Sequence, residues 1–185
     1  MDLTSFSHGQ IHSKIWLCDN LEPYLTKNCN ILILGGWYNV LGFMLFVRNN
    51  DINKITTIDI DKKVKPIADK ISDAWIYYDK VENITLDVDT LTSTDYEKYD
   101  VIINCSLEHM NTNSIWFDNI PNNKLICLQS SDVLIKEDPW LITNPIINLE
   151  YFTQKYKIQN QYFIDEKQIK IDNYGYKRFM LIGLK

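Results

Sequence analysis

The chain has 185 residues, of which 45% are hydrophobic and 23% are charged, as expected for a globular protein with one hydrophobic core. Its net charge of −5 argues against a broad basic surface that binds DNA or RNA. No apolar run reaches the roughly 18 residues of a membrane span, and the first residues lack the pattern of a signal peptide. The cysteines are widely spaced without a CxxC, so we expect free thiols of a cytoplasmic protein rather than disulfides or a zinc site.

Residues 1–28 precede the first predicted strand and are expected to form a helical segment. Apolar residues at near-helical spacing predict a helix over residues 13–25, lying against a sheet and bent at Pro23. The polar residues around Gln10, His12 and Lys14 have two interpretations. They form a lid that points Gln10, His12 or Lys14 at a ligand, or they form a solvated helix start capped by Ser7 or Ser13.

Residues 30–61 carry the pattern around which we interpret the rest of the chain. An apolar run, 31–34, stops at Gly35 and Gly36, and an apolar helix around 40–47 follows. A second apolar run, 55–58, ends at Asp59 and Asp61. Continuous apolar strands indicate a parallel sheet, whose crossover brings the glycine turn and the acids to neighbouring strand ends. This predicts a nucleoside-cofactor site, and an ordinary βαβ unit with a solvated aspartate is the alternative.

The remaining elements continue the same alternation. An amphipathic helix is expected over 62–72, with Asp61 as its N-cap and Pro66 in its first turn, followed by an aromatic strand fragment at 75–78. Strands are expected at 83–87, 99–105 and 124–129, and helices at 113–120 and 146–155. A binding loop is expected over 133–145. Two β-like runs, 157–164 and 178–184 with a turn at 172–175, predict a closing antiparallel hairpin.

Five βα units and a closing hairpin, together with the segment ILILGG, make the chain similar to the class I S-adenosylmethionine-dependent methyltransferase family. The resemblance implies an α/β fold, a Rossmann-like, mainly parallel seven-stranded sheet with helices on both faces, in a single domain over residues 1–185. It also implies S-adenosylmethionine as cofactor and S-adenosylhomocysteine as product. The segment departs from the family pattern because Ile33 replaces an acid, while Trp37 and Asn39 stand where glycines are common.

The resemblance implies roles for particular residues. Asp59, or Asp61 as the alternative, would hold the ribose hydroxyls. Residues expected to contact the cofactor are Gly35, Gly36, Asn39, Asp59, Ile60, Asp87, Val88, Asn104, Cys105 and Ser106. Residues expected near the substrate are Gln10, Lys14, Trp37, Tyr38 and Trp140.

Glu108 and His109 resemble an acid–histidine pair that follows the fourth strand in many family members. His109 is the candidate base, because the pKa of a free histidine lies near neutral pH, and Glu108 would orient it or bind an ammonium group. The alternative is that Glu108 caps a helix and His109 packs against the strand end.

The resulting hypothesis is methyl transfer to an unidentified acceptor, with a small molecule favoured and RNA or protein acceptors left open. In-line transfer from a sulfonium needs positioning and no metal. Two alternatives remain. One is aminopropyl transfer or cleavage of the same cofactor, and the other is a non-catalytic cofactor-binding partner of another subunit.

Overall fold

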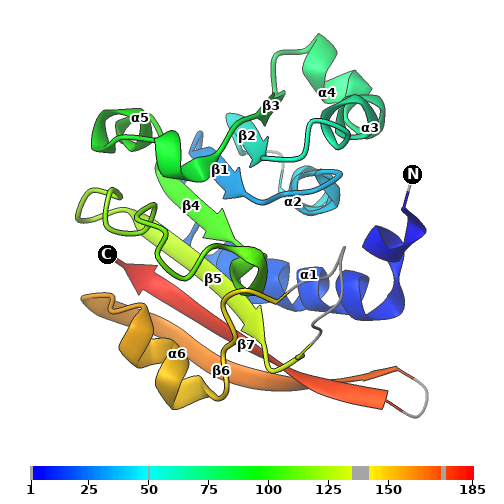
Figure 1. Cartoon of the computed structure of the whole chain (residues 1–185). Helices are drawn as coiled ribbons and strands as arrows, with labels where there is room; N and C mark the ends of the chain where they lie inside the picture. The colour runs from blue at the N-terminus through cyan, green and yellow to red at the C-terminus, as the bar shows by residue number, and fades with distance from the viewer. Residues whose placement is uncertain (1, 50, 135–141, 172–173) are drawn as a thin grey trace.

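The computed structural model describes residues 2–49, 51–134, 142–171 and 174–185. These residues form a seven-stranded sheet in the order β3-β2-β1-β4-β5-β7-β6 (Figure 1). The first five strands are parallel, and β7 runs antiparallel to both β5 and β6. The predicted fold is therefore confirmed. The strands are β1 (Asn30–Leu34), β2 (Lys54–Asp59), β3 (Val81–Thr85), β4 (Val101–Asn104), β5 (Leu125–Ser131), β6 (Asn160–Ile171) and β7 (Tyr174–Leu184).

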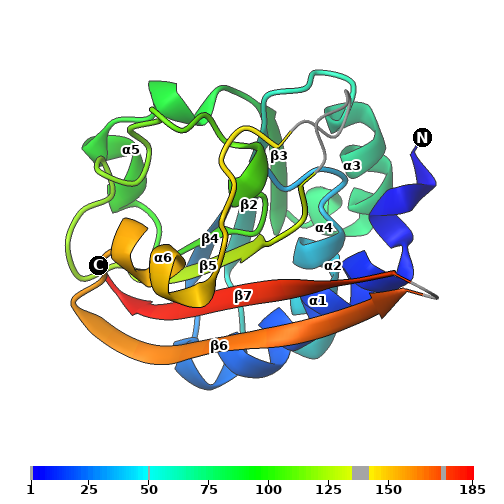
Figure 2. The same cartoon turned by 60° about the horizontal axis from the view of Figure 1, so that its bottom comes forward.

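Helices cover both faces of the sheet (Figures 1 and 2). The helices α1 (His8–Leu21), α2 (Val40–Arg48) and α4 (Asp73–Tyr77) share one apolar core with Ile31 and Ile33 of β1. The helices α5 (Ser93–Glu97) and α6 (Leu149–Lys155) share the other core with Leu32 and Leu34. Because alternate residues of a strand face opposite sides, this double burial requires the continuous apolar run seen in the sequence.

The turn between β1 and α2 adopts an unusual backbone conformation. Gly35, Trp37 and Asn39 all have positive φ, at 61°, 49° and 57°. The buried side chain of Asn39 accepts a hydrogen bond from Thr57 Oγ1 at 2.8 Å and donates one to Ser72 Oγ at 3.2 Å. These bonds tie the turn to β2 and to the end of α3 (Lys65–Ile71), and they hold Asn39 in a backbone region that non-glycine residues rarely adopt.

Two glycines make room for this arrangement. A Cβ on Gly36 would lie 2.2 Å from Thr57 Cγ2, and a Cβ on Gly42 would lie 2.1 Å from Asn39 Oδ1. Gly42 stands inside α2, where a glycine is normally destabilising relative to alanine. A glycine is needed there because the Asn39 amide occupies the space that a side chain would fill.

Several predicted element boundaries were wrong. Helix α1 begins at His8 rather than at residue 13, and it ends at Leu21, so that Pro23 does not bend it. Helix α3 begins at Lys65 with Pro66 in its first turn, while the Asp61 carboxylate accepts a bond from Lys63 N in the preceding turn instead of capping the helix. The expected strand fragment at 75–78 lies mostly in helix α4.

The expected helix at 113–120 is a series of turns, in which Trp116 is buried but Ile115 is 52% exposed. Helix α6 begins at Leu149, because the Asn148 side chain accepts a bond from Tyr151 N and caps it there. Residues 135–141 of the expected binding loop and residues 172–173 of the expected hairpin turn lie outside the described residues.

The cysteines Cys18, Cys29, Cys105 and Cys127 are free thiols, as predicted. Burial raises the pKa of Cys18 to about 12 and also raises the pKa of Cys127, which makes these two thiols poor nucleophiles. Within the described part of the chain, no helix is long and apolar enough to cross a membrane.

The packing around Asn39 predicts that a Gly→Ala substitution in helix α2 destabilises the protein, whereas such a substitution in a helix usually stabilises it. Gly→Ala inside a helix normally gains about 0.8–1.0 kcal/mol. We expect Gly42→Ala instead to lower the free energy of unfolding by about 1–3 kcal/mol, because the new methyl group displaces the buried amide of Asn39. Urea unfolding measures the change.

The matched control is the same substitution in an Asn39→Gly background. Glycine accepts the positive φ of position 39 and removes the amide that the new methyl group would meet. The cost of Gly42→Ala should disappear in that background. An equal cost in both backgrounds would contradict the explanation.

Candidate functional site

A cavity of about 1050 Å³ opens at the carboxyl ends of β1, β2 and β4. Its wall comes from the N-terminal segment, the β1–α2 turn, the residues after β2 and β3, and the residues that follow β4. Pockets for small molecules in proteins typically measure about 300–1,000 Å³, and open α/β sheets bind ligands at this edge. The cavity therefore lies where the sequence predicted the site.

The tips of β1 and β4 meet directly at the cavity. Ser106 Oγ donates a hydrogen bond to the carbonyl oxygen of Gly35 at 2.8 Å. A Cβ on Gly35 would lie 3.0 Å from both Ser106 Cβ and Met110 Cε, and its φ of 61° also favours glycine. The glycine thus lets the segment after β4 pack directly against the turn, and Gly35 itself lines the cavity.

Asp59 ends β2 and presents its carboxylate to the cavity. Its Oδ2 accepts a bond from Trp37 N at 2.9 Å, and its Oδ1 accepts one from Asp61 N at 3.0 Å. Burial raises the pKa of Asp59, although both backbone N–H donors act in the opposite direction. A carboxylate offers about four acceptor positions, so each oxygen retains capacity for a hydroxyl group of a ligand.

A second carboxylate, Asp89, anchors the loop that forms the next part of the wall. Asp89 Oδ1 accepts bonds from Ile115 N at 3.0 Å, from Trp116 N at 3.3 Å and from Ser114 Oγ. The neighbouring Asp87 caps the 3₁₀ helix Val88–Thr90 by accepting a bond from Asp89 N. These contacts explain why residues 113–120 form turns, since Asp89 holds two backbone N–H groups at the point where a helix was expected.

Glu108 forms a buried ion pair with Arg178 of β7. Glu108 Oε1 lies 2.6 Å from Arg178 Nη1 and accepts a further bond from Ser131 Oγ at 3.2 Å. Arg178 Nη2 also donates to the carbonyl oxygen of Cys105 at 2.5 Å. Burial lowers the pKa of Arg178, but the charges of Glu108, Tyr176 and Cys105 and the hydrogen bond to Glu108 together outweigh burial, so the net pKa is raised. The charge of Glu108 is thus neutralised from within the protein.

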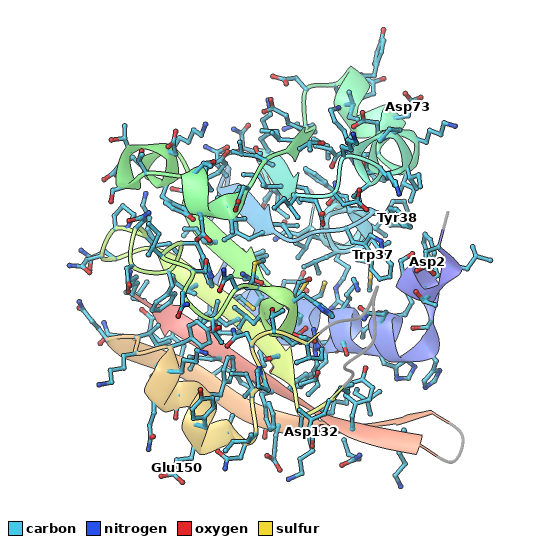
Figure 3. All side chains as sticks on the ribbon, in the orientation of Figure 1. Asp2, Trp37, Tyr38, Asp73, Asp132 and Glu150 are labelled. Atoms are coloured by element: carbon cyan, nitrogen blue, oxygen red, sulfur yellow. The ribbon has the colours of Figure 1, made fainter. Side chains whose placement is uncertain are left out.

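The N-terminal segment closes the remaining side of the cavity. Figure 3 shows Asp2 beside Trp37 and Tyr38, and the Asp2 backbone N–H donates to Tyr38 Oη at 3.0 Å. Further along, Lys14 of α1 is buried and donates a hydrogen bond to Gln10 Oε1 at 2.7 Å. Trp37 forms part of the cavity wall rather than filling the cavity, and its ring lies 5.4 Å from that of Tyr38.

The cavity brings together most of the residues that the sequence had singled out. The lining residues among them are Gln10, Lys14, Gly35, Gly36, Trp37, Tyr38, Asp59, Ile60, Asp87, Val88, Cys105, Ser106, Glu108 and His109. Asp61, considered as the alternative to Asp59, also lines it.

Three residues are placed differently. The amide of Asn39 faces Thr57 and Ser72 beneath the turn, and Asn104 is fully buried with its Oδ1 accepting a bond from Ser106 N. Trp140 lies outside the described residues.

Sequence reasoning missed several lining residues and two supporting ones. The lining residues missed were Asp2, Lys63, Val64, Ile67, Asp89, Met110, Asn111, Thr112, Ser114 and Thr143. The supporting residues were Arg178 and Ser131, which hold Glu108. Asp89 could have been noticed, because it follows Asp87 at a predicted strand end. Nothing local to Arg178 indicates that it reaches the site.

Comparisons with known proteins bear on the fold. No family model and no curated protein matches the sequence. Among solved structures, the methyltransferase domain of bacterial CtHen1 has a TM-score of 0.64 at 12% identity, covering 94% of this chain and 99% of that one. The N-terminal domain of EvdMO1, solved with S-adenosylhomocysteine bound, has a TM-score of 0.66 at 11% identity, covering 96% and 84%.

The chain has the class I methyltransferase fold. It also matches TehB from Haemophilus influenzae at 10% identity with a TM-score of 0.64, over 89% of its own length. It spans only 60% of the length of that TehB chain. At these identities the likeness concerns the arrangement of the class I sheet and helices.

The three bonds to Asp89 predict a local effect of its removal. We expect Asp89→Ala to lower the free energy of unfolding by about 1–3 kcal/mol, because the Ile115 and Trp116 N–H groups lose their acceptor. Hydrogen exchange should accelerate at those two amides. Asp118→Ala, at an exposed acid in the same segment, is the control and should change neither measurement. Unchanged exchange at Ile115 and Trp116 would contradict the anchoring role.

Proposed function

We propose that this protein binds S-adenosylmethionine and transfers its methyl group to an acceptor, with a small molecule favoured. The observation that carries the proposal is the meeting of the Gly35–Gly36 turn, the Asp59 carboxylate and the Ser106 tip around one cavity. The fold supports it, because open α/β sheets bind nucleotide-like ligands at these strand ends.

The residues present fit such a cofactor. The oxygens of Asp59 retain acceptor capacity for two ribose hydroxyls, and the Gly35–Gly36 turn lines the same cavity beside the proposed ligand chain. Asp87 and Val88 line the same cavity beyond Asp59, at the position proposed for the adenine. Cys105 and Ser106 would then lie beside the methionine part. When bound, the cofactor supplies an electrophilic methyl group on a sulfonium.

The chain's own contribution is mainly positioning. Holding donor and acceptor in line can supply roughly 7–11 kcal/mol of barrier reduction. His109 is exposed at the cavity and is the proposed base for an acceptor that arrives protonated. Glu108, already paired with Arg178, is proposed to fix the segment that carries His109 rather than to take a proton.

The proposal also covers the cellular compartment, the domain organisation and the kind of acceptor. The free cysteines suit a reducing compartment, and we place the enzyme in the cytoplasm. Residues 1–28 are proposed to act as a lid within a single domain over 1–185, since Asp2, Gln10 and Lys14 all line the cavity. A small acceptor is favoured because the net charge of −5 gives no support for nucleic acid.

The role of Asp59 is tested by calorimetry with S-adenosylhomocysteine. We expect Asp59→Asn to weaken binding by about 1.5–3 kcal/mol, the range for hydrogen bonds to a charged group, which is roughly tenfold to a hundredfold in Kd. Asp61→Asn is the matched control and should bind within about threefold of the wild type, because its carboxylate serves the turn at Lys63.

A wild type that binds neither S-adenosylmethionine nor S-adenosylhomocysteine at millimolar concentration would remove the proposal. Turnover is checked by mass spectrometry. S-adenosylhomocysteine is the expected product, whereas methylthioadenosine would indicate aminopropyl transfer or cleavage instead.

A further inference from the structure

Lys14 is a buried lysine that has no counter-charge among the described residues. The residue is only 7% exposed, yet it lines the cavity. Its ammonium donates to the neutral Gln10 Oε1 at 2.7 Å and forms no ion pair with the described residues. A lysine ammonium has three donors, so the others have no acceptor within the described part of the chain. A buried, unpaired charge is costly and invites an anionic ligand.

The neighbours of Lys14 in the described part of the chain do not supply that anion. Glu108 is close enough to influence Lys14, but its Oε1 lies 2.6 Å from Arg178 Nη1. Arg178 also carries a buried Nε that has no acceptor among the described residues. Lys14, Glu108 and Arg178 therefore sum to one net positive charge, with hydrogen-bond donors in excess. Burial lowers the pKa of Lys14, which is the expected response of an ammonium that lacks a counter-ion.

The position of Lys14 relative to the sheet separates its ammonium from the proposed cofactor contacts. The carbonyl oxygen of Ser13 accepts a bond from Gln129 of β5, so that Lys14 sits over the β5 side of the sheet. The strand order from Asp59 runs β2, β1, β4, β5 and β7. At about 4.8 Å per strand, β5 lies roughly 14 Å and β7 roughly 19 Å across from β2. The Gly35–Ser106 contact on β1 and β4 lies between them.

We propose that Lys14 binds a carboxylate on the methyl acceptor, so that the acceptor is an organic acid. The inference rests on the proposed function, because it takes the adenosyl group at Asp59 and the sulfonium beside Ser106. The acceptor then occupies the β5 side of the cavity, with its carboxylate at Lys14 and Gln10. The cofactor carries a carboxylate of its own, and the experiment must distinguish the two sources.

The test uses benzoate as the acid probe and benzamide as its neutral counterpart, titrated into protein saturated with S-adenosylhomocysteine. The wild type should bind benzoate at least tenfold more tightly than benzamide. Lys14→Met should lose this preference while it binds S-adenosylhomocysteine within threefold of the wild type. Lys63→Met is the matched control, since Lys63 also lines the cavity but is exposed, and it should keep the preference.

Two results would overturn the proposal. One is equal binding of benzoate and benzamide by the wild type. The other is a tenfold or greater loss of S-adenosylhomocysteine affinity in Lys14→Met, which assigns Lys14 to the cofactor's carboxylate. If Lys14→Met does not fold, Lys14→Gln replaces it. If the wild type fails to bind S-adenosylhomocysteine, the proposed function falls, and the benzoate titration of ligand-free protein still decides whether Lys14 binds an acid.

Discussion

The buried amide of Asn39 is the contact on which the geometry of the site depends. It bonds Thr57 of β2 and Ser72 after α3, and it holds a turn that has three residues at positive φ. From that turn, the Gly35 carbonyl oxygen reaches Ser106 beyond β4. One short segment thus connects the ends of three strands, and the wall of the cavity inherits its rigidity from the sheet.

The architecture could be predicted because its signals are local. Continuous apolar runs mark the buried parallel strands, and a Gly-Gly step marks the turn above the first of them. Where a helix or turn depends on distant groups, the prediction failed. Residues 113–120 have helical spacing, but the carboxylate of Asp89 takes the backbone N–H groups of Ile115 and Trp116. Trp75 belongs to a helix because its ring packs against Phe43 and Phe46, at centroid distances of 5.1 and 6.0 Å.

The residues of the candidate site divide in the same way, into those that the local sequence marks and those that depend on distant groups. Gly35, Asp59 and Ser106 were found because each stands at or just after the end of a strand, and parallel strands place their carboxyl ends at one edge. The ion pair of Glu108 could not be foreseen, because its partner Arg178 stands 70 positions later, in the antiparallel strand β7. The burial of Lys14 could not be foreseen either, since it depends on how α1 packs against the sheet.

Strand β7 is the last strand of the sequence, yet it lies between β5 and β6 in the sheet, and this affects the order of folding during synthesis. A chain leaves the ribosome amino end first, at about 5–20 residues per second. The nascent protein therefore exposes Glu108 and the unpaired edge of β5 for several seconds. Strand β7 then emerges, and it pairs with that edge and brings Arg178 to Glu108. Completion of the cavity must wait for this last strand, so the parallel core can form early while the cavity is completed only at the end of translation.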